Sequence, residues 1–205
     1  MNKQYKVGAV VFDGFELLDM FGPLEMLGLL PENFELHMVA EKTGPVASAQ
    51  GPNTVATAAF SDSDRYEILL IPGGRGTRVE VENSVFLQWL RSQAGDADFV
   101  TSVCTGSALL ARAGLLDGVR ATTNKAAFEW VTSQGENVDW VKQARWVEDG
   151  KFFTSSGVSA GIDMTLALIA RILGQPQAEE VAKWAEYDWH EDASWDPFAK
   201  IHNLV

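Results

Sequence analysis

The chain has 205 residues, of which 46% are hydrophobic, and a formal net charge of −12. A chain of this size and composition can bury the core of one compact domain, so we expect residues 1–205 to fold as a single domain. The excess negative charge disfavours nucleic acids and anionic membrane surfaces as partners, because like charges repel over about a Debye length.

The first residues and the cysteine content indicate the cellular compartment to expect. No charged segment followed by an apolar run opens the sequence, and no stretch approaches the roughly 18 apolar residues of a membrane span. A single cysteine cannot form an internal disulfide, so a reducing compartment is the default and we expect a cytoplasmic protein. The three histidines, His37, His190 and His202, are scattered without metal-ligand spacing. We therefore expect neither a metal nor another cofactor.

Apolar runs of strand length alternate along the chain with longer segments of helical period. The predicted strands cover residues 6–12, 34–41, 66–74, 99–103 and 120–123. The predicted helices cover residues 15–30, 79–94, 106–116, 125–134, 160–173 and 177–187. We expect the first helix to be interrupted near Gly22-Pro23, because proline disfavours a helical conformation in the residue before it.

Two hairpins are predicted beside these elements. Asp149-Gly150 lies between two β-prone runs within residues 141–156, which is the pattern of a hairpin with a primed turn. The segments that flank Gly51-Pro52 predict a second, small β-hairpin excursion. The alternation of strands and helices itself predicts a doubly wound, mostly parallel α/β sheet with helices on both faces.

The only cysteine lies at a special place in this arrangement. In doubly wound sheets the reactive groups gather at the carboxyl ends of the strands, and Cys104 stands between the strand 99–103 and the helix 106–116. The run Cys-Thr-Gly-Ser predicts a sharp strand-to-helix elbow of the kind that exposes a nucleophile. The partial positive charge of a helix N-terminus favours a thiolate there. The alternative is a small buried core residue, which is what most free cysteines are.

A nucleophile needs an anion site, and the loop "IPGGRG" (71–76) ends another central strand. The backbone N–H groups of Gly73 and Gly74, together with that of Thr105, would form an oxyanion hole. The same two glycines are also a common way for a chain to leave a strand, so this motif alone is weak evidence.

A proton carrier must come from another part of the chain, because no histidine follows Cys104 closely. Asp13, Glu16 and Asp19 lie just beyond the first predicted strand. Glu16 and Asp19 are three residues apart and share a helix face, so either could reach a neighbouring strand end. A carboxylate here could equally serve as a charge partner of the helix N-terminus.

Three blocks in order, "IPGGRG", "TSVCTGSALLARAGLLDGVRATT" and "SSGVSAGIDM", resemble the DJ-1/PfpI superfamily. The resemblance runs from residues 6–12 to about residue 174 and is strongest to the isocyanide hydratases, whose elbow also reads "SVCTGS". It implies a flavodoxin-like fold, usually as a homodimer, in which Cys104 attacks the isocyanide carbon and water then releases an N-substituted formamide. "LLDMFGP" matches the hydratase pattern Leu-Asp-x-x-Gly-Pro, which implies that Asp19 manages protons; Thr105 matches a threonine that supports the site.

The sequence departs from many relatives at one position. Where they read "TTHW", this chain reads "TTNK", so Asn124 stands in for a histidine. Asparagine cannot titrate, and a mechanism that uses that histidine as a base is therefore in doubt for this chain. A mechanism that uses the carboxylate is unaffected.

Other functions stay open. One is a glyoxalase- or deglycase-like activity on α-oxoaldehydes, and another is a redox-sensing or chaperone-like protein in which Cys104 is oxidised to a sulfinate. The sensor domain of a transcriptional regulator is disfavoured, because no basic helix-turn-helix segment follows the α/β region.

The last 20 residues form an aromatic and acidic tail, which contains Trp189, Trp195 and Phe198 among five acidic side chains. Aromatic residues at this density rarely stay exposed, so we expect the tail to pack over the body or over a partner subunit. A roof over the active site is the alternative.

Overall fold

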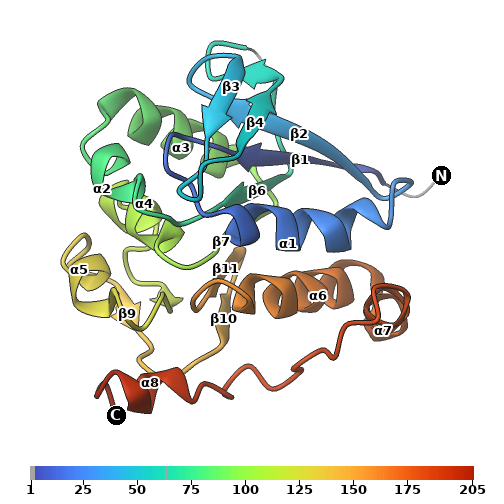
Figure 1. Ribbon diagram of the computed structural model, residues 1–205, viewed down its shortest axis with the longest axis vertical. Helices are drawn as coiled ribbons and strands as arrows, with labels where there is room; N and C mark the ends of the chain where they lie inside the picture. Colours follow the sequence, from blue (N-terminus) through green and yellow to red (C-terminus); the bar gives the residue numbers. More distant parts are fainter. Residues whose placement is uncertain (1–2, 63) are drawn as a thin grey trace.

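The computed structural model describes residues 3–62 and 64–205, and its centre is a seven-stranded sheet in the order β10-β11-β7-β6-β1-β2-β5 (Figure 1). The strands are β1 (Tyr5–Val10), β2 (Phe34–Ala40), β5 (Ala58–Ala59), β6 (Ile68–Ile71), β7 (Phe99–Ser102), β10 (Trp146–Asp149) and β11 (Phe152–Ser155). Neighbouring strands pair in parallel except for β10 and β11. The predicted doubly wound, mostly parallel sheet is confirmed.

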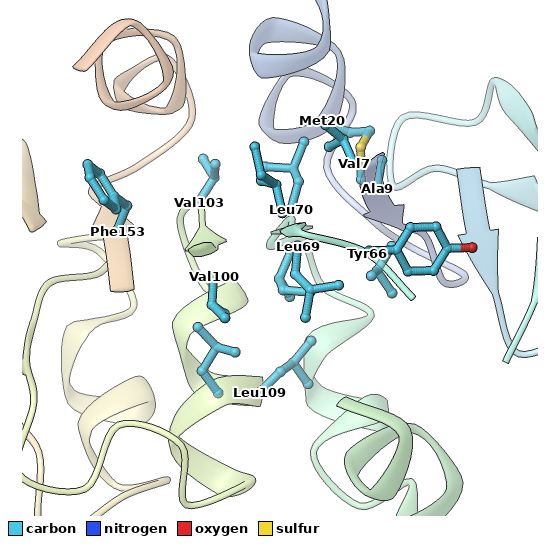
Figure 2. Close-up of a cluster of buried hydrophobic side chains, with 14 of the residues drawn as sticks. Val7, Ala9, Met20, Tyr66, Leu69, Leu70, Val100, Val103, Leu109 and Phe153 are labelled. Atoms are coloured by element: carbon cyan, nitrogen blue, oxygen red, sulfur yellow. The ribbon is translucent and has the colours of Figure 1, made fainter. Parts of the chain in front are cut away.

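Helices cover both faces of this sheet. Helices α1 (Leu17–Gly28) and α6 (Ala160–Leu173) lie on one face, and α3 (Ser84–Asp96) and α4 (Gly106–Arg112) lie on the other (Figure 2). The remaining helices are α2 (Thr77–Glu80), α5 (Phe128–Thr132), α7 (Gln175–Trp184) and α8 (Phe198–Ile201).

The core lies in two layers, one on each side of the sheet. Successive side chains of a strand point to opposite faces, so Leu70 of β6 points toward α1 and α6, whereas Leu69 points toward Val100 and Leu109 (Figure 2). All four residues are buried. Burial on both faces explains why β6 reads as an unbroken hydrophobic run rather than as an alternating one.

Both predicted hairpins are present. Strands β3 (Gly44–Ala47) and β4 (Asn53–Ala56) pair antiparallel and form the small excursion. Strands β10 and β11 also pair antiparallel, and Gly150 in their turn has a φ of +59°, which glycine adopts without strain.

The predicted interruption of the first helix is wrong, because α1 runs through Pro23 without a break. The proline removes one backbone donor from the helix. In return α1 packs tightly on α6: a Cβ atom at Gly22 would lie only 2.8 Å from Ile162 Cγ1. Packing of an apolar face outweighs the local preference, as is usual for helices in proteins.

Two other predicted helices have different bounds. The helix expected over 79–94 is split into α2 and α3, since Asn83 caps α3 by accepting the N–H groups of Val85 and Phe86 at 3.1 and 3.2 Å. The helix expected over 106–116 ends at Arg112, and Gly114 follows with a φ of +73°.

The strand predicted over 120–123 is not part of the central sheet. Its first residues form β8 (Arg120–Ala121), which pairs in parallel with the unexpected β9 (Asp139–Trp140). The N–H of Thr122 donates to the Thr154 side chain at 2.9 Å, so a hydroxyl replaces a backbone partner at that point. The helices expected over 125–134 and 177–187 are observed as α5 and α7, and α8 was not predicted.

Candidate active site

Cys104 occupies the predicted elbow between β7 and α4. Its φ of +57° lies in the left-handed region, where a residue with a side chain is strained by about 1–3 kcal/mol. Hydrogen bonds hold this conformation: the Cys104 N–H donates to the Ser156 carbonyl at 3.1 Å, and the Thr123 hydroxyl donates to the Cys104 carbonyl at 2.8 Å. Strained residues that are fixed in this way cluster at functional sites.

The elbow also depends on Gly106, the first residue of α4. A Cβ atom there would lie 2.3 Å from the carbonyl oxygen of Ile71, so only glycine lets α4 approach the end of β6. This close approach brings Cys104 beside the loop that contains Gly73 and Gly74.

Asp19, in the first turn of α1, is a fully buried carboxyl group. Its Oδ2 accepts the N–H of Gly73 at 2.8 Å, while its Oδ1 has no hydrogen-bond partner among residues 3–62 and 64–205. Burial raises the pKa of Asp19 to about 8, and the charge of Glu16 adds to this rise, whereas the Gly73 N–H and the nearby Cys104 thiol act in the opposite direction. At neutral pH Asp19 is therefore mostly a neutral acid.

The sulfur of Cys104 is surrounded by this carboxyl and by three donors. Burial, followed by the charge of Asp19, raises the pKa of the thiol to about 12, and hydrogen bonds from the Thr105 N–H, the Val158 N–H and the Asn124 side chain lower it. The expectation that the helix N-terminus keeps a thiolate at rest is therefore corrected, because desolvation is the larger effect. The thiol and the carboxyl form a coupled pair, since the charge of Asp19 is one cause of the raised pKa of the thiol.

The two glycines after β6 position this pair. The N–H of Gly73 is used by Asp19, and the N–H of Gly74 donates to Thr105 Oγ1 at 3.1 Å, so neither is a free oxyanion donor. A Cβ atom on Gly73 would lie 2.5 Å from Thr105 N and 2.9 Å from Asp19 Oδ2. The loop thus brings the acid and the elbow together, and the backbone donors that face the sulfur are those of Thr105 and Val158.

The hydroxyl of Thr105 supports the loop rather than the sulfur. It contacts the Thr77 hydroxyl at 3.2 Å, and Thr77 in turn donates to the Gly74 carbonyl at 2.7 Å. Both threonines are buried, so this network fixes the loop against α4.

The structure distinguishes between the carboxylates that the sequence left open as proton carriers. The Glu16 side chain accepts a hydrogen bond from Gln50, and its charge acts on Asp19 from a distance. Asp13 accepts the N–H of Ala47 at 3.2 Å. Asp19 is therefore the carboxyl group that lies beside Cys104.

Asn124, at the position where the resemblance implies a histidine, reaches the thiol. Its Oδ1 accepts the N–H of Ala127 at 3.1 Å, which leaves the amide nitrogen to donate to Cys104. A Cβ atom at Gly157 would lie 2.4 Å from that nitrogen, so glycine is needed to make room for it. The side chain is thus a fixed, non-titrating donor.

Val158 is the site residue that the sequence analysis missed. Its φ of +37° is an outlier for a β-branched residue, and this conformation turns its N–H toward the sulfur. Nothing in the letters "SSGVSAG" marks a valine for a left-handed conformation, so the sequence carries no signal for it.

None of the three histidines takes the place of Asp19. His37 lies 3.1 Å from Glu35 on β2, the ring of His190 stacks on Trp195, and His202 belongs to α8's C-terminal end. Within the part of the chain that the structure describes, no group of three or more His, Cys, Asp or Glu side chains could hold a metal ion, and no helix could cross a membrane.

A pocket of about 300 Å³ lies on the Val158 side of the site. Its lining residues are Asn124, Lys125, Ala126, Ser156, Gly157, Val158, Ser159, Phe198 and His202. The last two come from the aromatic tail, which runs back along the body of the protein from α7 to α8 (Figure 1). The tail therefore packs over the body and contributes to the walls of this pocket, but Trp195 and Phe198 stay 42% and 47% exposed, so the expected burial of its aromatic side chains is only partly met.

Known proteins are similar to this chain over most of its length. The DJ-1/PfpI family model matches residues 5–171. The chain is 38% identical to an isonitrile hydratase of Pseudomonas putida over 182 residues, which cover 89% of this chain and 78% of the hydratase. It is 27% identical to the HTH-type transcriptional regulator CdhR of Pseudomonas aeruginosa over 85% of this chain, but spans only 52% of the regulator.

A solved structure has a similar fold. The crystal structure of a ThiJ/PfpI family protein from Pseudomonas syringae superposes with a TM-score of 0.85 at 29% identity, covering 98% of this chain and 84% of that one. The flavodoxin-like architecture thus extends over nearly the whole chain.

Proposed function

This chain belongs to the DJ-1/PfpI family, and we propose that it hydrates an isonitrile to an N-substituted formamide through Cys104 and Asp19. The observation that carries the proposal is the placement of the thiol beside a fully buried carboxyl group whose Oδ1 has no partner among the described residues. The similarity to an isonitrile hydratase supports this choice of electrophile.

The reaction begins from the pair with one proton. The proton moves from sulfur to Asp19, the thiolate attacks the terminal carbon of the isonitrile, and Asp19 delivers the proton to that carbon. A sulfur–carbon bond and a carbon–hydrogen bond form, and the product is a thioimidate bound to Cys104. Asp19 is left as a carboxylate.

Water completes the reaction. The Asp19 carboxylate takes a proton from water while the oxygen adds to the thioimidate carbon, and the same proton then passes to the nitrogen. The carbon–sulfur bond breaks, the thiolate leaves, and the hydroxyl proton returns to Asp19. The sum is one isonitrile and one water converted to one formamide, with the one-proton pair restored.

The surroundings of the sulfur fit these steps. The N–H groups of Thr105 and Val158 and the amide of Asn124 stabilise the thiolate when it forms and when it leaves. Since Asn124 cannot carry a proton, Asp19 is the group that can exchange one with the reacting atoms.

Mass spectrometry of products tests the proposal. Wild-type protein incubated with a panel of alkyl isonitriles should release the corresponding formamides, and Cys104→Ala should release none while its circular dichroism spectrum is unchanged. Turnover of methylglyoxal in place of every isonitrile would instead assign the glyoxalase- or deglycase-like activity. Slow oxidation of Cys104 with no turnover of either class would assign the redox-sensing function.

A further inference from the structure

The pocket on the Val158 side adjoins the reacting sulfur through residues that touch both. Asn124 and Val158, which donate to Cys104, also line the pocket, and Gly157 lies between them. The carbonyl of Ser156, another lining residue, accepts the Cys104 N–H. This space is therefore the nearest described pocket into which a molecule bonded to the sulfur could extend its substituent.

Another part of the pocket wall comes from the C-terminal tail. Phe198 and His202 line the pocket from α8, and Phe198 is 47% exposed although it is a large aromatic residue. A half-exposed aromatic side chain on a pocket wall offers apolar contact to a ligand.

A buried ion pair fixes this wall relative to the sulfur. Lys125 Nζ lies 3.0 Å from Asp196 Oδ2, and both side chains are only 1% exposed. The other oxygen of Asp196 accepts the N–H of Phe198 at 3.0 Å, at the start of α8. Since Lys125 directly follows Asn124, which touches the thiol, a short chain of contacts joins the tail to the active site.

The same ion pair determines the charge of the pocket. The Lys125 ammonium donates to Thr122 Oγ1, the Thr123 carbonyl and the Ala144 carbonyl at 2.7, 2.9 and 3.0 Å, besides its contact with Asp196. All of its hydrogen-bonding capacity and its charge are satisfied within the protein, so it cannot neutralise an anionic ligand. Apart from His202, the other lining residues have no ionisable side chain, so the pocket favours an uncharged substituent.

We infer that the C-terminal tail determines substrate selectivity, with Phe198 as the wall that limits the size of a neutral substituent on the electrophile. The inference rests on the proposed function for the identity of that electrophile. Since the Phe198 ring takes up one side of this space of about 300 Å³, 1-adamantyl isocyanide should be disfavoured relative to the smaller cyclohexyl isocyanide.

The experiment compares Phe198→Ala with Ile201→Ala, a variant in the same helix whose side chain is 65% exposed and does not line the pocket. Phe198→Ala should raise kcat/KM for adamantyl relative to cyclohexyl isocyanide by about tenfold, as expected when bulk is removed from an apolar wall. Ile201→Ala should leave the ratio unchanged. Wild-type protein should also prefer ethyl isocyanoacetate over the isocyanoacetate anion.

A second readout does not need turnover. Cys104 is the only cysteine, so labelling by N-methylmaleimide and N-phenylmaleimide, followed by intact mass, reports access of a small and a large reagent to one sulfur. Phe198→Ala should raise the rate ratio of large to small reagent, and Ile201→Ala should not.

The two readouts separate two kinds of failure. If Phe198→Ala changes neither ratio while isonitriles are hydrated, the selectivity wall is refuted and the proposed function stands. If no isonitrile is hydrated but the maleimide ratio rises in Phe198→Ala, the wall stands and the proposed function fails.

Discussion

Two aspartates, Asp19 and Asp163, are fully buried in this protein, and they are treated in opposite ways. Asp163 lies in the first turn of α6 and accepts the Arg145 side chain at 2.5 and 2.6 Å, the Tyr187 hydroxyl at 3.0 Å and the His190 N–H at 3.0 Å. Asp19 has the Gly73 N–H, the neighbouring thiol and no cation.

The difference shows what each carboxyl group is for. A buried charge that is paired and fully hydrogen-bonded holds the surrounding segments in place, and here it fastens the tail to the body. A buried carboxyl group without a cation is destabilised in its charged form, so its pKa rises into the range where a proton can be both given and taken near neutral pH. This contrast favours a structural role for Asp163 and supports the proposed role of Asp19 in proton transfer.

The largest expected effect is on turnover. Asp19→Asn should lower kcat/KM for an isonitrile by about 10² to 10⁴, the usual contribution of general acid–base catalysis. Glu16→Gln is the matched control, because its side chain contacts Gln50 rather than Cys104, and it should retain most activity. Near-normal activity in Asp19→Asn combined with loss in Glu16→Gln would reverse the assignment.

Asp163→Asn should act on stability instead. It leaves the Arg145 guanidinium buried without a counter-ion, which typically costs about 3–5 kcal/mol. Urea denaturation measures the loss. The control is Glu148→Gln, which breaks the exposed pair with Arg171 and should cost no more than about 1 kcal/mol. If both substitutions cost the same small amount, the buried pair does not fasten the tail.

The pH dependence of stability provides a further test of the role of Asp19. The pKa of Asp19 is raised from 3.8 to about 8 on folding. The folded protein therefore binds more protons than the unfolded chain between these values, so this contribution to stability is complete below about pH 4 and is lost as the pH rises through 8. Asp19→Asn removes the effect and should be the more stable protein at pH 9, by an amount on the order of a few kcal/mol.

Activity should change with pH in the opposite sense. The reactive form of the pair has lost one proton, so kcat/KM should rise with pH to a plateau above about 8, the value to which burial raises the pKa of Asp19. The plateau above about pH 8 should be absent from the residual activity of Asp19→Asn, because the thiol itself must then lose its proton to the solvent. A wild-type profile that is flat between pH 6 and 9 would contradict the assigned role.

Much of this arrangement was predictable, because it depends on local patterns. The alternation of apolar strands and helices, the glycine at position 106 and the chain's only cysteine predict the sheet and the elbow. The family pattern around Asp19 implied which carboxylate is used, and the structure places that residue beside the sulfur. The homodimer that the resemblance implies stays a prediction, and light scattering would test it.

The features of the site that the sequence did not predict depend on contacts between distant residues. The backbone of Val158 is turned by the packing around it, and the protonation of Cys104 is set by burial rather than by its place at a helix N-terminus. The ion pair of Lys125 with Asp196 joins residues 71 positions apart in the sequence, and neither residue shows locally that it will be buried. Which of these residues become buried depends on contacts between distant parts of the chain, so local sequence patterns do not predict it.

The smallest expected effect tests whether any histidine contributes a proton. His190 stacks its ring on Trp195 at 4.4 Å, and only its backbone N–H reaches Asp163, so His190→Ala keeps that hydrogen bond and removes one stacked contact. It should cost about 0.5–1.5 kcal/mol of stability, the value of an aromatic pair. The kcat/KM for a small isonitrile and its pH profile should be those of the wild type. His202 lines the pocket, so for His202→Ala only the pH profile is expected to be unchanged, because neither imidazole lies among the groups that shift the pKa of Cys104. A pH profile displaced in either variant would show that a histidine shares the proton transfer, and the contrast between a structural and a chemical aspartate would then no longer account for the reaction.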